Sequence, residues 1–222
     1  MLPVITAEQL ADFIDVFCED GFVSVAETKQ LCSAGMQYGL IPKIHANQLG
    51  LSGGTQAGVQ LQAISVDHLK NMDEAAINTL AQSPTVGTML PGAAFFLRMP
   101  VPPTRQMINA NCALALASDY NPGSCPSGNM NMVVALACIQ MKMLPEEAIN
   151  AATINGAFAM NLQNEVGSIT PGKQANIILT KSIPSLHYLP YSFGTNLVDK
   201  VMIKGRWITP HVPAVPELLL PV

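Results

Sequence analysis

Residues 113–126 read Ala-Leu-Ala-Leu-Ala-Ser-Asp-Tyr-Asn-Pro-Gly-Ser-Cys-Pro, an apolar run that ends in the acid Asp119 and a turn rich in proline and glycine. Small and branched apolar residues before a turn predict a strand buried on both faces, as in parallel sheets covered by helices. In those folds, functional side chains follow the carboxyl ends of the strands. An ordinary turn, in which Asp119 or Asn121 bonds only nearby backbone, gives the same local pattern. Other segments must therefore decide whether Asp119 belongs to a functional site or only to an ordinary turn.

Four earlier segments repeat the order of an apolar run followed by a helical pattern. Strands are expected over residues 14–18, 41–45, 63–66 and 86–90, ahead of the fifth over 113–117. Helices are expected over residues 25–38, around Ala57, and over 72–82 and 104–111, with Asn71 or Asp73 capping the third. Alternating strands and helices at this spacing predict βα units and a parallel sheet. The fold class expected is therefore α/β.

The pattern changes after Asp119. Helices are expected over residues 129–143 and 145–160, where Pro145 suits a first helical position. Short antiparallel strands are then expected within residues 167–179, 198–203 and 205–208. We therefore divide the chain into an α/β domain over residues 1–165, a small β module over 166–208 and a proline-rich tail over 209–222.

Composition limits the kinds of partner. The 222 residues are 49% hydrophobic and 12% charged, with a net charge of −4, so there is no basic stripe for nucleic acid and a small-molecule ligand is expected. No uninterrupted apolar run reaches the roughly 18 residues of a membrane span, and no signal-peptide pattern is present, so a cytoplasmic location without membrane contact is the default. A mean hydropathy of +0.31 predicts that a partner subunit or another part of the same chain covers some of the surface.

Each predicted strand ends in polar or special residues, and parallel strands bring such ends together on one rim. These residues are Glu19 and Asp20, His45, Asp67 and His68, Pro91 and Gly92, and Asp119. Imidazole and carboxylate groups bind borderline cations such as zinc, so His45 and Asp119 are candidate ligands of one metal. A catalytic zinc needs three protein ligands, yet the sequence has no His-x-His or His-Glu-x-x-His motif. Either the site is not metallic or its other ligands lie outside this chain.

Five segments taken together carry a resemblance to a known family. They are Phe-Cys-Glu-Asp-Gly-Phe-Val-Ser (17–24), Lys-Ile-His-Ala-Asn-Gln-Leu (43–49), Val-Asp-His-Leu (66–69), Leu-Pro-Gly-Ala-Ala-Phe-Phe-Leu (90–97) and Ala-Ser-Asp-Tyr-Asn-Pro-Gly-Ser (117–124). In this order they resemble the imidazolonepropionases of the amidohydrolase superfamily. The similarity runs through about residues 10–208, and residues 151–157 and 167–173 resemble the C-terminal part that the superfamily shares.

The resemblance implies a distorted (β/α)8, TIM-like barrel with a flanking β-sandwich module. This chain would supply about strands four to eight and the C-terminal part of the module. The family's first-strand His-x-His pair, and an arginine on an early strand, have no counterpart here. The implied reaction is hydrolysis of 4-imidazolone-5-propanoate to N-formimidoyl-L-glutamate in histidine degradation, with one divalent metal, zinc or iron. A homo-oligomer, a dimer, is expected of the full-length protein.

The resemblance also implies roles for single residues. His45 and Asp119 correspond to metal ligands, and His68 and Asp119 to the catalytic groups that move protons. Gln48 corresponds to a substrate contact, and a glutamine cannot act as a general base. The turn residues Asn121, Gly123 and Ser124 also correspond to substrate contacts. How the proton transfers divide between Asp119 and His68 stays open.

Three hypotheses follow from the sequence. The first is a metal-dependent cyclic amidohydrolase whose site is completed by residues outside this chain. The second is an inactive or regulatory half-barrel that oligomerises or complements an N-terminal piece. The third is an amidohydrolase that acts on another cyclic amide or on a deaminase substrate.

Overall fold

A computed structural model describes residues 1–208, so the predicted tail lies outside the described residues. A five-stranded sheet forms its centre. Its strands are β1 (Phe13–Cys18), β2 (Ile41–Ala46), β3 (Ser65–His68), β4 (Val86–Met89) and β5 (Leu114–Leu116). They lie side by side in chain order, and every neighbouring pair is parallel. The predicted parallel α/β fold is confirmed.

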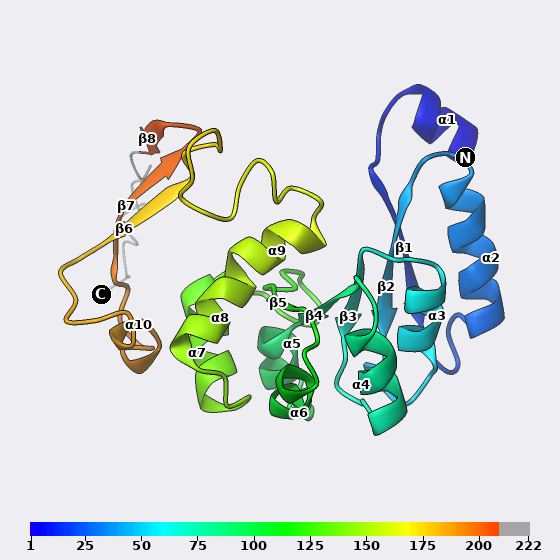
Figure 1. Ribbon diagram of the computed structural model, residues 1–222, viewed down its shortest axis with the longest axis horizontal. Helices are drawn as coiled ribbons and strands as arrows, with labels where there is room; N and C mark the ends of the chain where they lie inside the picture. The colour runs from blue at the N-terminus through cyan, green and yellow to red at the C-terminus, as the bar shows by residue number, and fades with distance from the viewer. Residues whose placement is uncertain (209–222) are drawn as a thin grey trace, which may run out of the picture.

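Helices connect successive strands, as the sequence pattern predicts (Figure 1). They are α2 (Val25–Met36), α3 (Gly54–Gln60), α4 (Glu74–Ala81), and α5 (Pro91–Phe96) with α6 (Thr104–Asn109). The Ser24 hydroxyl caps α2 in a capping box with Glu27, and the Asp73 carboxylate accepts the Ala76 amide to cap α4. Of the two candidate caps for α4, Asp73 is therefore the one used.

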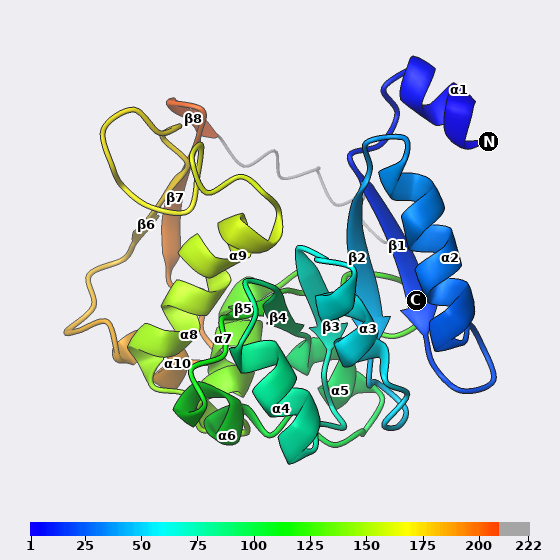
Figure 2. The ribbon, with the colours of Figure 1, turned by 45° about the vertical axis from the view of Figure 1, so that its right-hand side comes forward.

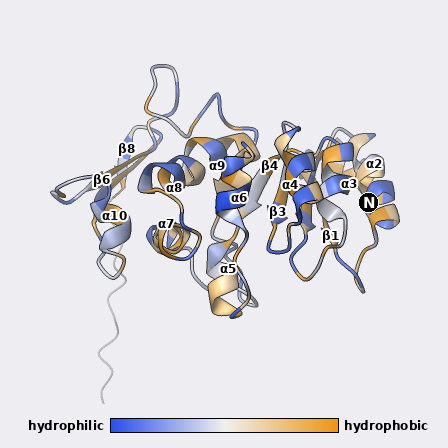
Figure 3. Ribbon diagram, turned by 60° about the horizontal axis from the view of Figure 1, so that its bottom comes forward, coloured by the Kyte–Doolittle hydropathy of each residue, from blue (hydrophilic) through white to orange (hydrophobic). Residues whose placement is uncertain are grey.

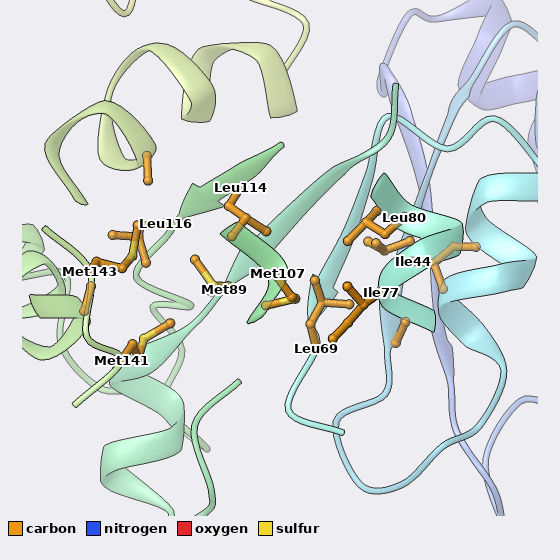
Figure 4. Packing of buried hydrophobic residues seen from close by; sticks show 14 of the residues in the cluster. Ile44, Leu69, Ile77, Leu80, Met89, Met107, Leu114, Leu116, Met141 and Met143 are labelled. Carbon is orange, nitrogen blue, oxygen red and sulfur yellow. The ribbon is translucent and has the colours of Figure 1, made fainter. Parts of the chain in front are cut away.

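The main apolar core lies between the sheet and these helices. Side chains that alternate along the strands, such as Ile44 on β2 and Met89 on β4, meet Leu80 and Met107 from the helices (Figure 4). Glycine permits the closest approach of helix to sheet, since a Cβ on Gly58 of α3 would lie 2.3 Å from the Val66 Cγ1. The opposite face of the sheet is left for the polar side chains described below.

The structure corrects the bounds of three predicted elements. Strand β3 was expected over residues 63–66, but pairing with β2 continues to Ala46 opposite His68, so Asp67 and His68 lie inside the strand. The helix expected over residues 145–160 is two helices, α8 (Pro145–Ala152) and α9 (Ile154–Ala159), because Thr153 between them leaves the helical conformation at φ −123° and ψ −90°. The helix before them, α7, spans Met130–Ile139 and ends earlier than expected.

A separate antiparallel sheet follows the α/β part. It contains β6 (Ile177–Thr180), β7 (Val198–Ile203) and β8 (Arg206–Ile208), in that order. Figures 1 and 2 place this sheet beyond α7, α8 and α9, on the opposite side of the molecule from β1. The short helices α1 (Leu2–Ala7) and α10 (Tyr188–Tyr191), like α5, were not predicted. The division at residue 165 stays a prediction.

Part of the surface is apolar. Phe95 and Phe96 on α5 are each 51% exposed, and α5 stands out as hydrophobic in Figure 3. Within residues 1–208, no helix combines the length and apolar character needed to cross a membrane. The expectation that another subunit or segment covers the apolar surface stays a prediction.

Candidate functional site at the carboxyl ends of the strands

Several residues with unusual backbone conformations lie at the carboxyl ends of the parallel strands. Asn47 directly follows β2, His68 and Leu69 lie at the end of β3, and Asp119 follows β5. All four are non-glycine residues with positive φ, at 53°, 80°, 55° and 53°. Such backbone is unfavourable for L residues and is often found at functional sites, where the surrounding structure holds it. These four positions lie on the rim that the sequence pattern indicated, although seven other non-glycine residues of the described chain also have positive φ.

An acid on the neighbouring strand orients His45. The Asp15 carboxylate on β1 accepts from Nδ1 of His45 on β2, at 3.0 Å to Oδ1 and 2.8 Å to Oδ2. This hydrogen bond is the main reason that the pKa of His45 is raised. Because Nδ1 is occupied, Nε2 is the ring nitrogen left to bind a ligand.

His68 lies beside His45, with ring centroids 5.2 Å apart. His68 is only 3% exposed. Burial lowers the pKa of His68 to about 3, so the ring is neutral at physiological pH. Its Nδ1 is buried and has no hydrogen-bond partner among residues 1–208. A buried polar atom without a partner is costly, so this nitrogen is available to a ligand.

The turn after β5 holds the Asp119 carboxylate by two side chains. Asn121 Nδ2 donates to Oδ1 at 3.3 Å, and the Ser124 hydroxyl donates to Oδ2 at 3.3 Å. The Asn121 oxygen accepts the amides of Gly123 at 2.9 Å and Ser124 at 2.7 Å, which is an Asx turn. The ordinary turn that the sequence allowed is thus present, and the side chain that forms it is Asn121 and not Asp119. The charge of Asp119 contributes, less than Asp15 does, to the raised pKa of His45.

Loop contacts fix Gln48 at the same rim. Its backbone amide donates to the carboxylate of Glu19, which follows β1 and is 2% exposed, and its carbonyl accepts from Asn71 Nδ2 at 3.1 Å. Asn47 donates from Nδ2 to the Asn71 carbonyl at 2.8 Å. The ends of β1, β2 and β3 are therefore tied together around Gln48, whose half-buried side chain has no hydrogen bond within residues 1–208.

Sequence reasoning missed two residues of this rim. Asp15 is the single acid inside the apolar strand Phe-Ile-Asp-Val-Phe-Cys, and that isolation was the available signal. Its partner could not be read from the sequence, because the pairing of β1 with β2 sets it. The other missed residue is Lys70, two positions after His68 and only 5% exposed.

The donor atoms at this rim fit a divalent cation. His45 Nε2 and the Asp119 carboxylate are the nitrogen and oxygen donors that zinc and iron accept, and Asp15 is the acid that commonly orients a ligating histidine. Among residues 1–208, no group of three or more His, Cys, Asp or Glu residues is arranged to hold a metal. The described chain therefore offers two oriented donors.

Sequence comparison identifies the family. The model of the Amidohydrolase family matches residues 23–208. The chain belongs to the amidohydrolase family. It is 55% identical over 208 residues to the imidazolonepropionase of Flavobacterium johnsoniae, covering 94% of this chain and 51% of that protein. It is 44% identical over 212 residues to the imidazolonepropionase of Bacteroides fragilis, covering 96% and 50%. This amidohydrolase chain thus spans about half the length of the curated relatives it matches, and the match is to their C-terminal part.

Solved structures agree with the amidohydrolase fold. An adenosine deaminase from Xanthomonas campestris with bound zinc superposes with a TM-score of 0.72 at 21% identity, covering 84% of this chain and 49% of that one. A Xaa-Pro dipeptidase superposes with a TM-score of 0.73 at 19% identity, covering 92% and 56%. At these identities the likeness shows the fold alone, and it is again a likeness to about half of each chain.

Proposed function

We propose that this chain carries the carboxyl-end half of an imidazolonepropionase site, which hydrolyses the cyclic amide of 4-imidazolone-5-propanoate to N-formimidoyl-L-glutamate in histidine degradation. The observation that carries the proposal is the convergence of His45, His68 and Asp119 on one strained rim. These residues lie in a chain 55% identical to an imidazolonepropionase. The other ligands and substrate contacts would come from strands that this chain does not contain.

We propose His45 and Asp119 as the ligands of one divalent cation, zinc or iron. When bound, such a cation lowers the pKa of water toward about 7 and polarises a carbonyl group. The Asp15 carboxylate fixes the tautomer of His45 so that Nε2 faces the ligand. Asn121 and Ser124 hold the Asp119 carboxylate in place.

Proton transfer would fall to Asp119 and His68. In the overall reaction the water oxygen bonds to the ring carbonyl carbon, the amide bond to the ring nitrogen breaks, and a proton from water ends on that nitrogen. Asp119 can accept the proton of water and pass it on, a role that contributes about 10²- to 10⁴-fold. His68 is neutral, so it can hydrogen-bond the ring or relay a proton without adding charge. Gln48 cannot be the base, but its amide can hydrogen-bond the ring.

Complementation tests this assignment. The chain is co-expressed with the half of the Flavobacterium johnsoniae relative that it does not match, loaded with zinc and assayed with 4-imidazolone-5-propanoate. Asp119→Asn is expected to lower kcat at least 100-fold. The matched control Asp199→Asn, on exposed β7, removes the same charge and leaves kcat unchanged. Equal kcat in the two variants would refute the role of Asp119.

A further inference from the structure

Lys70 is a buried cation without an anionic partner among the described residues. It is 5% exposed, and its only hydrogen-bond acceptor within residues 1–208 is the thioether sulfur of Met99, at 3.1 Å from Nζ. A thioether is a weak acceptor, whereas an ammonium has three N–H donors. In the same part of the chain, no carboxylate oxygen lies within 4.0 Å of Nζ. At least two donors of this ammonium therefore have no acceptor among residues 1–208.

Backbone hydrogen bonds hold the segment that carries Lys70 beside the candidate site. The two residues before it, His68 and Leu69, both have positive φ. The Leu69 amide donates to the Ala46 carbonyl at 3.2 Å, and the Asn71 amide donates to the Asn47 carbonyl at 2.9 Å. Lys70 thus lies in a short, strained segment pinned on both sides to the end of β2, directly after His68.

The electrostatic surroundings of the ammonium agree with this position. Burial lowers the pKa of Lys70, while Asp119 and Glu19 act to raise it, and the lysine in turn helps to lower the pKa of His68. This is consistent with the place of Lys70 in the chain, two residues after His68, one of the two residues proposed to act on the reacting carbonyl. A lysine that served only to neutralise Asp119 or Glu19 would form an ion pair with one of them, which is not observed.

We propose that Lys70 binds the carboxylate that forms from the ring carbonyl when the amide is cleaved, an inference that rests on the proposed function. The product carries two carboxylates, this new one and that of the propanoate side chain. The proposed function puts the new carboxylate at the carbonyl carbon, beside Asp119 and His68, and Lys70 lies two residues after His68 with its ammonium buried and without an anionic partner in residues 1–208. The propanoate carboxylate is several bonds away. Lys70 is thus assigned to the anion that the reaction creates.

Three probes separate the two carboxylates. N-formyl-L-glutamate carries both, N-formyl-L-isoglutamine has an amide in place of the α-carboxylate, and N-formyl-L-glutamine has an amide in place of the side-chain carboxylate. Each is titrated into this chain by NMR in metal-free buffer, so that no bond to a metal contributes. We expect about tenfold tighter binding of N-formyl-L-glutamate than of N-formyl-L-isoglutamine, because charge-assisted hydrogen bonds are the strong ones.

Lys70→Met keeps the apolar stem and removes the donors. It should abolish the preference for the α-carboxylate and leave the preference for the side-chain carboxylate unchanged. The control Lys200→Met, on exposed β7, should change neither. If Lys70→Met perturbs folding, Lys70→Arg keeps the charge and should keep the α preference. An unchanged α preference in Lys70→Met, a loss confined to the side-chain preference, or binding of none of the probes by the unsubstituted chain would overturn the inference.

Measurements of kcat and KM separate this inference from the proposed function. In the complemented, zinc-loaded protein, Lys70→Met should lower kcat about tenfold with little change in KM, because the ammonium interacts with charge absent from the substrate carbonyl. Absence of turnover in the unsubstituted protein would count against the proposed function, while a Lys70-dependent α preference would still support the subsite. Normal turnover with an unchanged α preference in Lys70→Met would refute the subsite alone.

Discussion

The destabilisation caused by replacing Asp15 with asparagine should depend on pH. Asparagine can still accept a hydrogen bond from His45 Nδ1, so the change isolates the charge. Asp15 raises the pKa of His45 above its ordinary value, about 6.5. A raised pKa means that the pair stabilises the fold fully below that ordinary value, and that the stabilisation is lost as the pH rises through the raised one. The cost of Asp15→Asn should therefore be larger at pH 5.5 than at pH 8.5.

The geometry sets the size of this effect. Unit charges separated by the 2.8 Å between His45 Nδ1 and Asp15 Oδ2 attract by about 1.5 kcal/mol at the dielectric constant of water. The two side chains are 33% and 41% exposed, so screening and side-chain ordering reduce this, and exposed pairs typically contribute about 0.2 to 1 kcal/mol. We expect Asp15→Asn to lower the free energy of unfolding by about 0.5 to 1 kcal/mol at pH 5.5 and by little at pH 8.5.

Urea unfolding at the two pH values measures the difference. The control is Asp12→Asn, which removes the same charge from an exposed residue three positions away that has no ion pair within residues 1–208. It should show no comparable dependence on pH. An equal cost of Asp15→Asn at both pH values, or a larger cost at pH 8.5, would refute the reasoning.

Three further predictions concern the packing and the rim. The first is His68→Asn, in which asparagine tolerates the positive φ. As the pH falls from 6.5 to 5, its free energy of unfolding should rise relative to that of the unsubstituted chain by at most about 2 kcal/mol, because His68, whose pKa is lowered by burial, binds a proton more readily in the unfolded chain. Unfolding curves at the two pH values that lack this relative rise would contradict the prediction. Gly58→Ala should cost about 1 to 3 kcal/mol by overpacking, whereas Gly156→Ala in α9, where a Cβ meets nothing closer than 3.6 Å, should be neutral or stabilising; equal melting temperatures would refute the packing argument. Asn121→Ala should weaken zinc binding by the complemented protein about tenfold, since it removes support from Asp119; an unchanged affinity in a zinc titration would contradict it.

The regular part of the fold was predictable because its signals are local. Apolar runs and caps such as Ser24 and Asp73 are read from adjacent residues, and five runs at βα spacing leave few topologies. The break at Thr153 was not predictable, because residues 145–160 carry a continuous helical pattern. The extension of β3 to His68 depends on its register with β2, which no local pattern encodes.

The candidate site likewise has features that local sequence patterns indicate and features that only the folded structure reveals. His45, His68 and Asp119 were predictable because each comes at or just after the end of an apolar run. The partnership of Asp15 with His45 required the alignment of two strands, and the isolation of Lys70 required knowledge of everything around it. The roles of all the candidate residues stay predictions, since the structure describes their positions without a ligand: His45, Gln48, His68, Asp119, Asn121, Gly123 and Ser124.

The most direct test of the account is the hydrolysis of 4-imidazolone-5-propanoate by this chain, measured with and without the complementary half and with zinc present in both. We propose His45 and Asp119 as two ligands of the metal, and residues 1–208 hold no group of three or more His, Cys, Asp or Glu residues arranged to bind one. We therefore predict turnover only in the complemented protein. Equal turnover by this chain alone, or no turnover by a folded, zinc-loaded complemented protein, would contradict the account.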